Sequence, residues 1–158
     1  MKKQILATVM VLAMTLTLLP VTALASDPVG LYVAGTQITA AGYWVNDGSG
    51  GITSQDASES NYNVKYDGNG TLTLKGAQIT KSHAISDGGI SIPIGIYCEG
   101  SLNLVLNGTN TVGDETAQLQ AGILTTATLE IGGNGEISVT VTKDLAYGIM
   151  AGTGLNII

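Results

Sequence analysis

Short runs of alternating apolar and polar residues fill the chain from residue 62 onward. In the segment Leu102–Leu106 the leucines point one way, while Asn103 and Val105 point the other. No segment after residue 25 carries the longer period of an amphipathic helix, and 22 glycines interrupt the runs. The pattern therefore predicts an all-β protein made of short strands.

A spaced motif recurs three times within these runs. It reads Gly-Ile, five variable residues, Leu, one polar residue, then Leu or Ile, and the copies begin at Gly95, Gly122 and Gly148. The first leucines of the copies are 27 and 26 residues apart, and a weaker copy, Thr71–Leu74, lies 30 residues upstream. Such regular spacing is typical of a solenoid, in which each coil stacks about 4.8 Å above the last.

The alternative is a series of antiparallel hairpins, because Asn107-Gly108 and Asn134-Gly135 are also hairpin turn signals. The fixed offset between Gly-Ile and Leu-x-Leu favours the solenoid, since a hairpin protein does not require it. We therefore predict a right-handed parallel β-helix of about 26–30 residues per coil. A third strand per coil is expected at Thr109–Val112 and Glu136–Val141. The Gly before each Ile is expected to lie at a corner, where a Cβ would clash.

In this fold, equivalent residues form inward columns. The expected columns are Ile96, Ile123 and Ile149; Leu72, Leu102, Leu129 and Leu155; and Leu74, Leu104, Ile131 and Ile157.

Three regions are predicted along the chain. Residues 1–25 form a signal peptide, with a basic start, the apolar run Ile5–Leu19 and a small-residue cleavage site after Ala25. Residues 26–61 contain N-terminal strands and a cap. Residues 62–158 form the coils. The last coil is expected to be incomplete at the C-terminus, because Ile158 falls in the middle of it. We therefore expect these coils to pack against further coils of a longer chain. The protein is expected to be secreted or on the cell surface, with no membrane span after signal removal.

Charge narrows the class of partner. The net charge is −6, and four lysines and no arginine face twelve acidic residues after residue 25, giving −8 for the mature chain. Such a surface repels phosphate backbones, so nucleic-acid binding is not expected. Cys98 is the only cysteine and is interpreted as a small core residue, and the only histidine, His83, is assigned to an irregular segment away from it.

Acidic, glycine-rich loops at Asp47, Asp67 and Asp87 are candidate calcium sites, because calcium binds carboxylate and carbonyl oxygens from flexible loops. Ordinary turn chemistry is the alternative. No other cofactor is predicted.

Catalysis is not predicted. The outward column Thr73, Asn103, Glu130, Asn156 holds one carboxylate, whereas a glycosidase needs two facing one groove. A polysaccharide lyase would need a strong base on one face, and arginine is absent.

An apolar outward column is expected at Tyr97, Leu124 and Met150. Either the N-terminal segment with Tyr43 and Trp44 covers it as a cap, or it is a docking face for a partner or for sugar rings. The candidate ligand-binding residues are Trp44, Tyr43, Tyr97, Asn103, Glu130 and Asn156.

Two segments resemble a known family. Leu31–Thr39 resembles a Tyr-Val-Gly-Gly strand, with Ala34 at the first glycine, and Tyr66–Ile79 resembles a Tyr-Asp…Thr-Leu-Thr-Leu coil. Both are common in exported right-handed β-helix proteins of clostridia and related Firmicutes that are labelled carbohydrate-binding domain-containing. The resemblance covers nearly the whole mature chain and implies a secreted or cell-surface β-helix, often followed by further repeats and wall-attachment modules.

These observations favour a non-enzymatic surface module that binds carbohydrate, as an adhesin for a polysaccharide or a host or cell-wall glycan. A structural stalk or spacer of a larger surface protein is the first alternative. The N-terminal part of a polysaccharide lyase is the second.

Overall fold

The computed structural model describes residues 30–158, so the predicted signal peptide and its cleavage site after Ala25 lie outside the described residues. The described chain is all-β, with sixteen strands and no helix. The strands are β1 (Leu31–Val33), β2 (Thr36–Ile38), β3 (Gly42–Asn46), β4 (Ile52–Thr53), β5 (Val64–Tyr66), β6 (Thr71–Lys75), β7 (Gln78–Ile79), β8 (His83–Asp87), β9 (Ile90–Cys98), β10 (Leu102–Asn107), β11 (Thr109–Val112), β12 (Ala121–Thr125), β13 (Thr128–Gly133), β14 (Glu136–Val139), β15 (Tyr147–Ala151) and β16 (Gly154–Ile157).

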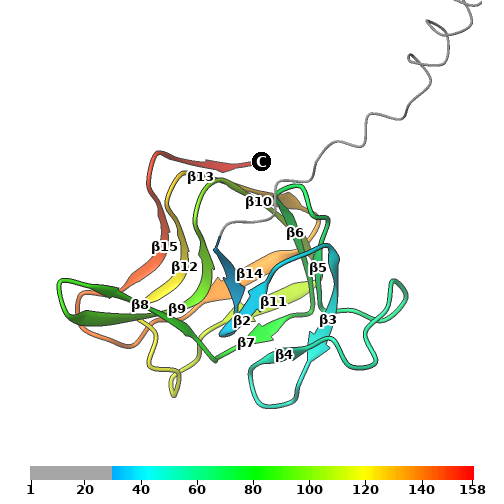
Figure 1. Ribbon diagram of the computed structural model, residues 1–158, viewed down its shortest axis with the longest axis horizontal. Helices are drawn as coiled ribbons and strands as arrows, with labels where there is room; N and C mark the ends of the chain where they lie inside the picture. The colour runs from blue at the N-terminus through cyan, green and yellow to red at the C-terminus, as the bar shows by residue number, and fades with distance from the viewer. Residues whose placement is uncertain (1–29) are drawn as a thin grey trace, which may run out of the picture.

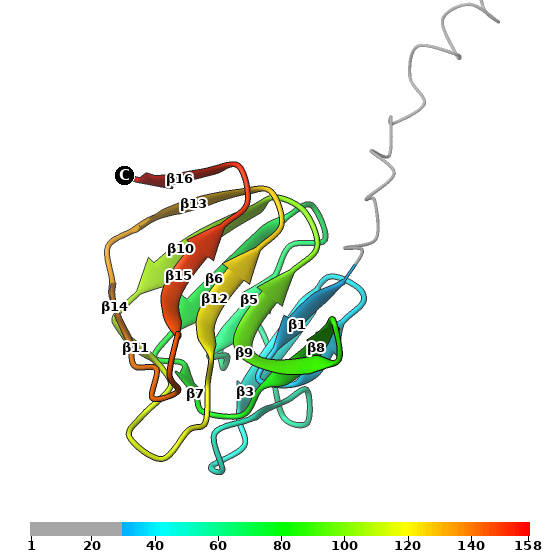
Figure 2. The ribbon, with the colours of Figure 1, turned by 90° about the vertical axis from the view of Figure 1, so that its left-hand side faces the viewer.

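The strands form three sheets, two of which mix parallel and antiparallel pairs. The first sheet has the order β15-β12-β9-β1-β2, with β8 also paired to β9; the second is β16-β13-β10-β6-β5-β3-β4; the third is β14-β11-β7. The chain passes through the first, second and third sheets in the order β9-β10-β11, and repeats this order in β12-β13-β14 (Figures 1 and 2). Each pass therefore adds one parallel strand to each sheet.

The register of the parallel strands confirms the residue columns expected for the three later copies of the motif. Ile123 lies opposite Ile96 on one side and Ile149 on the other. In the second sheet the aligned sets are Leu102, Leu129 and Leu155, and Leu104, Ile131 and Ile157. The expected third strand of each pass is also present, as β11 and β14 pair in parallel, although β14 ends at Val139 rather than at residue 141.

The column expected for the earliest copy is wrong by two residues. Leu72 lies opposite Leu104, not Leu102, and Leu74 lies opposite Leu106. A shift of two residues keeps the same side chains on the inner face, because side chains alternate along a strand. Burial is therefore preserved, and both Leu72 and Leu74 have no exposed surface.

The N-terminal strands cap the edges of two sheets. β1 pairs antiparallel with β9 at the edge of the first sheet, and β5 pairs antiparallel with β6 in the second sheet, followed by β3. The expectation that Tyr43 and Trp44 cover the column of Tyr97 is wrong, because they lie in the second sheet and Tyr97 lies in the first. Pairing with the edge strands satisfies their free backbone groups, which a cap laid over the outer face would not do.

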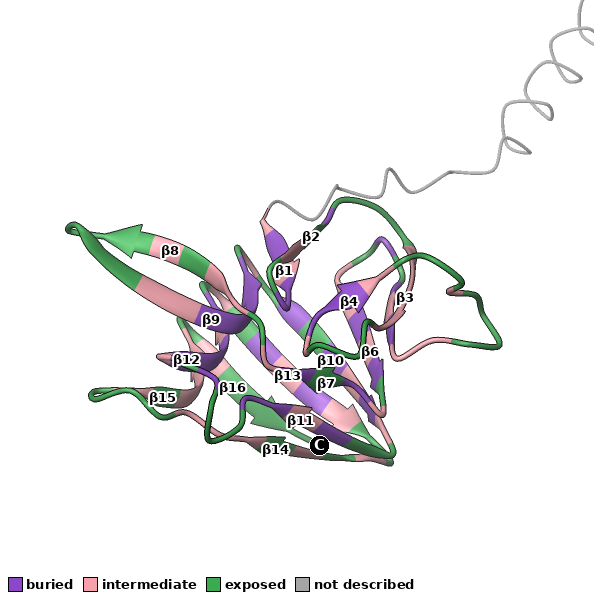
Figure 3. Cartoon of the chain, turned by 90° about the horizontal axis from the view of Figure 1, so that it is seen from below, coloured by how far each residue is buried: buried purple, intermediate pink, exposed green. Residues whose placement is uncertain are grey.

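An antiparallel hairpin, β8–β9, departs from the parallel pattern. His83 lies in β8, opposite Ile94, so its assignment to an irregular segment is wrong. The hairpin turns at Gly88 and Gly89, both with positive φ, and its tip is exposed (Figure 3).

A single large apolar core draws residues from all three sheets, among them Val33 and Ile96, Leu72 and Leu104, and Val112. Two of the glycines that precede the inward isoleucines, Gly95 and Gly122, are needed for this packing. A Cβ on Gly95 would lie 2.6 Å from the Val112 Cγ1 atom and 2.9 Å from the Gly122 carbonyl oxygen. The predicted clash of a Cβ is therefore confirmed at Gly95 and also holds at Gly122, but it is wrong at Gly148, where an added Cβ would meet nothing closer than 4.0 Å. The predicted corner is also wrong for Gly95, which lies inside strand β9.

One buried polar side chain, Asn110, connects successive passes of the chain near the start of β11, in the third sheet. It has no exposed surface, and its Oδ1 accepts a hydrogen bond from the Ala77 amide at 3.0 Å. Its Nδ2 donates to the carbonyls of Asn107, Gly108 and Glu136 at 3.1 to 3.3 Å. The amide thus satisfies backbone groups from three consecutive passes of the chain.

The strands of the last pass leave apolar residues open to solvent. Leu155 is 49% exposed and Ile157 is 71% exposed, whereas their counterparts Leu129 and Ile131 are 0% and 4% exposed. The residues of β16 that align with buried residues of β13 are therefore uncovered (Figure 3).

Candidate functional site

The outer surface of the second sheet gathers most of the polar side chains that the sequence singled out. Leu72, Leu74, Leu104 and Ile131 of this sheet are buried, so the residues that alternate with them point away from the core. We call this surface the polar face. Its outward residues are Tyr43, Lys65, Thr71, Thr73, Lys75, Asn103, Val105, Glu130 and Asn156.

Three of the candidate ligand residues form a row on the polar face. Glu130 lies between Asn103 and Asn156 in the parallel register, and Asn103 is followed by Thr71 rather than by the expected Thr73. Neighbouring strands lie about 4.8 Å apart, so this row offers amide and carboxylate groups at that spacing. Such groups hydrogen-bond readily with hydroxyl-rich ligands.

An open groove of about 370 Å³ lies at this row. It is lined by Asn69, Gly70, Ser101, Leu102, Asn103, Thr128 and Glu130. Hydroxyl groups extend the row at the corner of the coils, since the Thr128 and Thr153 hydroxyls are 3.1 Å apart. The volume lies within the usual range of small-ligand sites.

The opposite end of the polar face is aromatic and cationic. The Tyr43 and Tyr62 rings lie 5.6 Å apart with an interplanar angle of 49°. Lys65 Nζ lies 5.6 Å from the centroid of the Tyr43 ring, and Lys75 Nζ lies 5.2 Å from that of Tyr62. A second groove of about 350 Å³ adjoins it, lined by Ala41, Gly42, Tyr43, Lys65, Tyr66 and Asp67.

Trp44 lies apart from the polar face. It follows Tyr43 in β3 and lies opposite Val64, a buried residue, so it points to the inner side of the sheet. It packs against the main core as a partly buried residue. This packing fits a structural role for Trp44 in the core rather than direct contact with a ligand on the polar face.

Tyr97 lies on the outer side of the first sheet, but it is only 8% exposed. It packs in a small apolar cluster with Ile94 and Ala121, against which Tyr32 and Leu124 also pack. The His83 ring stacks on Tyr32 at 3.6 Å between centroids and lies 5.8 Å from Tyr97. Burial, together with the nearby Glu99 carboxylate, raises the pKa of Tyr97, and a covered ring of this kind offers no open platform.

The three aspartates proposed for calcium lie apart in the sequence, Asp47 and Asp67 in loops and Asp87 at the end of β8. Residues 30–158 contain no group of three or more His, Cys, Asp or Glu side chains placed to hold a metal. Asp67 accepts hydrogen bonds from the Asn69 and Thr71 amides at 2.7 and 2.9 Å. Burial would raise the pKa of Asp67, but these amides outweigh it and lower the pKa. Asp87 lies at the exposed tip of the β8–β9 hairpin.

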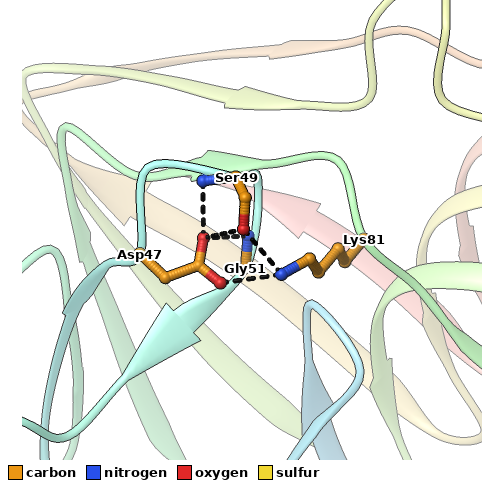
Figure 4. Close-up of polar contacts among 4 residues, drawn as sticks. All are labelled: Asp47, Ser49, Gly51 and Lys81. Atoms are coloured by element: carbon orange, nitrogen blue, oxygen red, sulfur yellow. Dashed lines mark hydrogen bonds and ion pairs between the residues drawn. The ribbon is translucent and has the colours of Figure 1, made fainter.

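Asp47 closes an exposed loop between β3 and β4. Its carboxylate accepts hydrogen bonds from the Ser49 and Gly51 amides and from Lys81 Nζ at 2.8 Å (Figure 4). The Lys81 ammonium and then the two amides hold the pKa of Asp47 well below its usual value. This network ties the β3–β4 loop to the segment that follows β7.

Cys98 belongs to the core. Burial, with a smaller effect of the Glu99 carboxylate, raises the pKa of the thiol to about 11. The thiol therefore stays protonated at neutral pH and lacks the thiolate that a nucleophile needs.

The sequence analysis missed Tyr62, Lys65 and Lys75 as members of the site. Lys65 alternates with Val64 and Tyr66, and Lys75 follows Leu74, so alternation alone would have placed both lysines outward. Tyr62 precedes β5 and carries no such signal.

Comparison with protein-family models, with curated proteins and with solved structures finds no match to this chain. Across residues 30–158, no helix has the length and apolar character needed to cross a membrane.

Proposed function

We propose that this chain is an exported, non-enzymatic module that binds carbohydrate through the polar face, on coils that form a right-handed parallel β-helix. The repeated passage through three sheets, with equivalent aliphatic residues in register, supports the coil architecture. The predicted signal peptide and the resemblance to exported clostridial β-helix proteins support export to the cell surface or medium.

The observation that carries the binding proposal is the combination of groups on one sheet surface. Two tyrosine rings 5.6 Å apart lie at one end, and the row of Asn103, Glu130 and Asn156 lies at the other. Tyrosine offers a flat apolar ring face, while amides and carboxylates hydrogen-bond with hydroxyls. Carbohydrates present both kinds of surface, apolar ring faces and equatorial hydroxyls.

A binding role fits this face better than catalysis. Glu130 is the one carboxylate among the outward strand residues of the polar face, and hydrolysis of a glycosidic bond uses a pair of carboxylates. Both grooves are open surface features, as expected for contact with a long polymer.

The test is affinity gel electrophoresis of the chain from residue 26 with soluble galactan, xylan, mixed-linkage β-glucan and polygalacturonate. Retardation by at least one polymer is expected, and it should be lost in the double variant Tyr43→Ala, Asn103→Ala. Tyr147→Ala is the matched control, because Tyr147 is 54% exposed on β15 of the first sheet and should leave retardation unchanged.

The alternative is a stalk that spaces other modules. The repeated in-register passes through the three sheets favour it, because a regular stack of this kind makes an extended spacer. Absence of retardation by all four polymers, with a cooperative melt showing that the protein is folded, would contradict the binding proposal and leave the stalk.

A further inference from the structure

The aromatic end of the polar face concentrates positive charge on an acidic protein. Beyond residue 25 the chain has four lysines and no arginine against twelve acidic residues. Two of the four, Lys65 and Lys75, lie beside Tyr43 and Tyr62 on the same sheet surface. We call these four residues the Tyr–Lys cluster.

The two lysines of the cluster have no carboxylate partner within the described chain. The ion pair found in residues 30–158 joins Lys81 to Asp47, in a different loop. The nearest acidic side chain lining the adjoining groove is Asp67, whose carboxylate accepts hydrogen bonds from two amides of its own turn. Lys65 and Lys75 instead rest over tyrosine rings, a weak contact at a half-exposed site that an anionic ligand readily replaces.

We infer that the Tyr–Lys cluster selects a polysaccharide with carboxylate groups on its sugar units, that is, one containing uronic acids. This inference rests on the proposed function. The tyrosine rings contact the sugar ring, and each ammonium group pairs with a carboxylate of the polymer. A charged pair of this kind forms a stronger hydrogen bond than a neutral hydroxyl does.

The position of Glu130 within the polar face limits where the charged sugar unit lies, because Asp67, at the Lys65 end, already accepts hydrogen bonds from the amides of its own turn. Glu130 is three strands away from Lys65 in the sheet order, or about 14 Å at the usual strand spacing. The acid-bearing unit therefore binds at the β3–β5 end, and units nearer Glu130 are held by hydroxyl contacts with Asn103 and Asn156. A densely charged polymer such as nucleic acid would meet Glu130 and the net negative surface, so it does not fit this face.

The test compares polygalacturonate with the same polymer after its carboxyl groups have been reduced to alcohols. Dissociation constants are measured by affinity gel electrophoresis for the chain from residue 26, at low and at moderate salt. We expect tighter binding of polygalacturonate, by about tenfold, and a loss of that preference as salt screens the charges. The double variant Lys65→Gln, Lys75→Gln should bind both polymers equally.

Lys143→Gln is the matched control, because Lys143 is exposed in the loop before β15 and the change removes the same charge elsewhere. It should retain the preference for polygalacturonate. Dextran sulfate, an anionic polymer without carboxylates, separates charge alone from uronate recognition: equal or tighter binding of it would overturn the inference.

The failure of this inference differs from that of the proposed function. Equal binding of the charged and reduced polymers by the unmodified chain would overturn the uronate inference but preserve carbohydrate binding. Binding of neither polymer would overturn the inference, and the wider polymer panel then decides the proposed function.

Discussion

The buried Asn110 side chain donates a hydrogen bond to the Glu136 carbonyl on the neighbouring coil at 3.1 Å. The same amide group accepts from the Ala77 backbone on the coil before it. One side chain of β11 thus links three passes of the chain, in addition to the sheet hydrogen bonds that pair β11 with β14 and β7.

Replacing Asn110 with Ala should destabilise the protein by about 2–4 kcal/mol, because it leaves buried backbone groups without partners. The measurement is the free energy of unfolding in urea. Asn103→Ala is the control, because Asn103 is exposed on the polar face and its loss should cost little. Similar losses for both variants would contradict a structural role specific to Asn110.

Replacing Gly122 with Ala should also destabilise, by about 1–3 kcal/mol, as expected for overpacking. A Cβ there would collide with the Val139 side chain and lie 2.7 Å from the Gly148 carbonyl oxygen. Gly148 occupies the equivalent position one pass later. A Cβ added there would lie 4.0 Å from its nearest neighbour, Val139 Cγ1. Gly148→Ala should therefore be tolerated, and thermal midpoints of the two variants test the difference.

The sequence was sufficient to predict the register of the later coils. In those copies the Gly-Ile pair and the Leu-x-Leu pair fix two points of each pass, so one alignment satisfies both. The earliest copy, at Thr71–Leu74, has no Gly-Ile pair, and a shift of two residues buries the same leucines. Hydrophobic pattern alone could not distinguish Leu102 from Leu104 as the partner of Leu72.

The Tyr–Lys cluster could not be predicted in the same way. Tyr43 and Lys65 meet because β3 pairs antiparallel with β5, and Lys75 joins them through the next strand. The β3–β5 pairing brings Tyr43 to Lys65, which is 22 residues further along the chain (65 − 43), and no repeat spacing specifies this pairing. The β8–β9 hairpin was missed for a related reason, since it interrupts the repeat and carries no copy of the motif.

The Asp47–Lys81 pair predicts an acid-dependent contribution to stability. Lys81, followed by the Ser49 and Gly51 amides, lowers the pKa of Asp47 below its ordinary value of 3.8. A lowered folded-state pKa stabilises the fold above the unfolded value, and this contribution is lost as the pH falls from 3.8 through the folded value.

Asp47→Asn should therefore lower the thermal midpoint near neutral pH, and its difference from the unmodified chain should shrink steadily below pH 3.8. Asp87→Asn is the control, because Asp87 lies at the exposed tip of the hairpin. A difference between Asp47→Asn and the unmodified chain that stays constant at every pH would contradict this account.

Calcium should have no effect on the stability of the described domain. The carboxylates of Asp47 and Asp67 accept amide hydrogen bonds within their own loops, and residues 30–158 contain no cluster of metal-binding side chains. The thermal midpoint should be the same in EDTA and in about 5 mM calcium, which exceeds the dissociation constants of weak extracellular sites. A rise in the midpoint with calcium would contradict this expectation and support a calcium site at one of the three aspartates, which single Asp→Asn variants would identify.

The uncovered strand β16 predicts self-association of the chain from residue 26 as its concentration rises. Leu155 and Ile157 are 49% and 71% exposed, and β16 has an unpaired edge. Covering one such side chain contributes about 1.5–3 kcal/mol, and an unpaired edge offers backbone hydrogen bonds to a second copy.

Ile157→Lys should shift the molecular mass measured by light scattering toward the monomer, because a charge at an edge opposes pairing. Asn156→Lys adds the same charge on the opposite side of the same strand, where it should have a smaller effect. A chain that stays monomeric at all concentrations, or an equal effect of both variants, would contradict association through the inward side of β16.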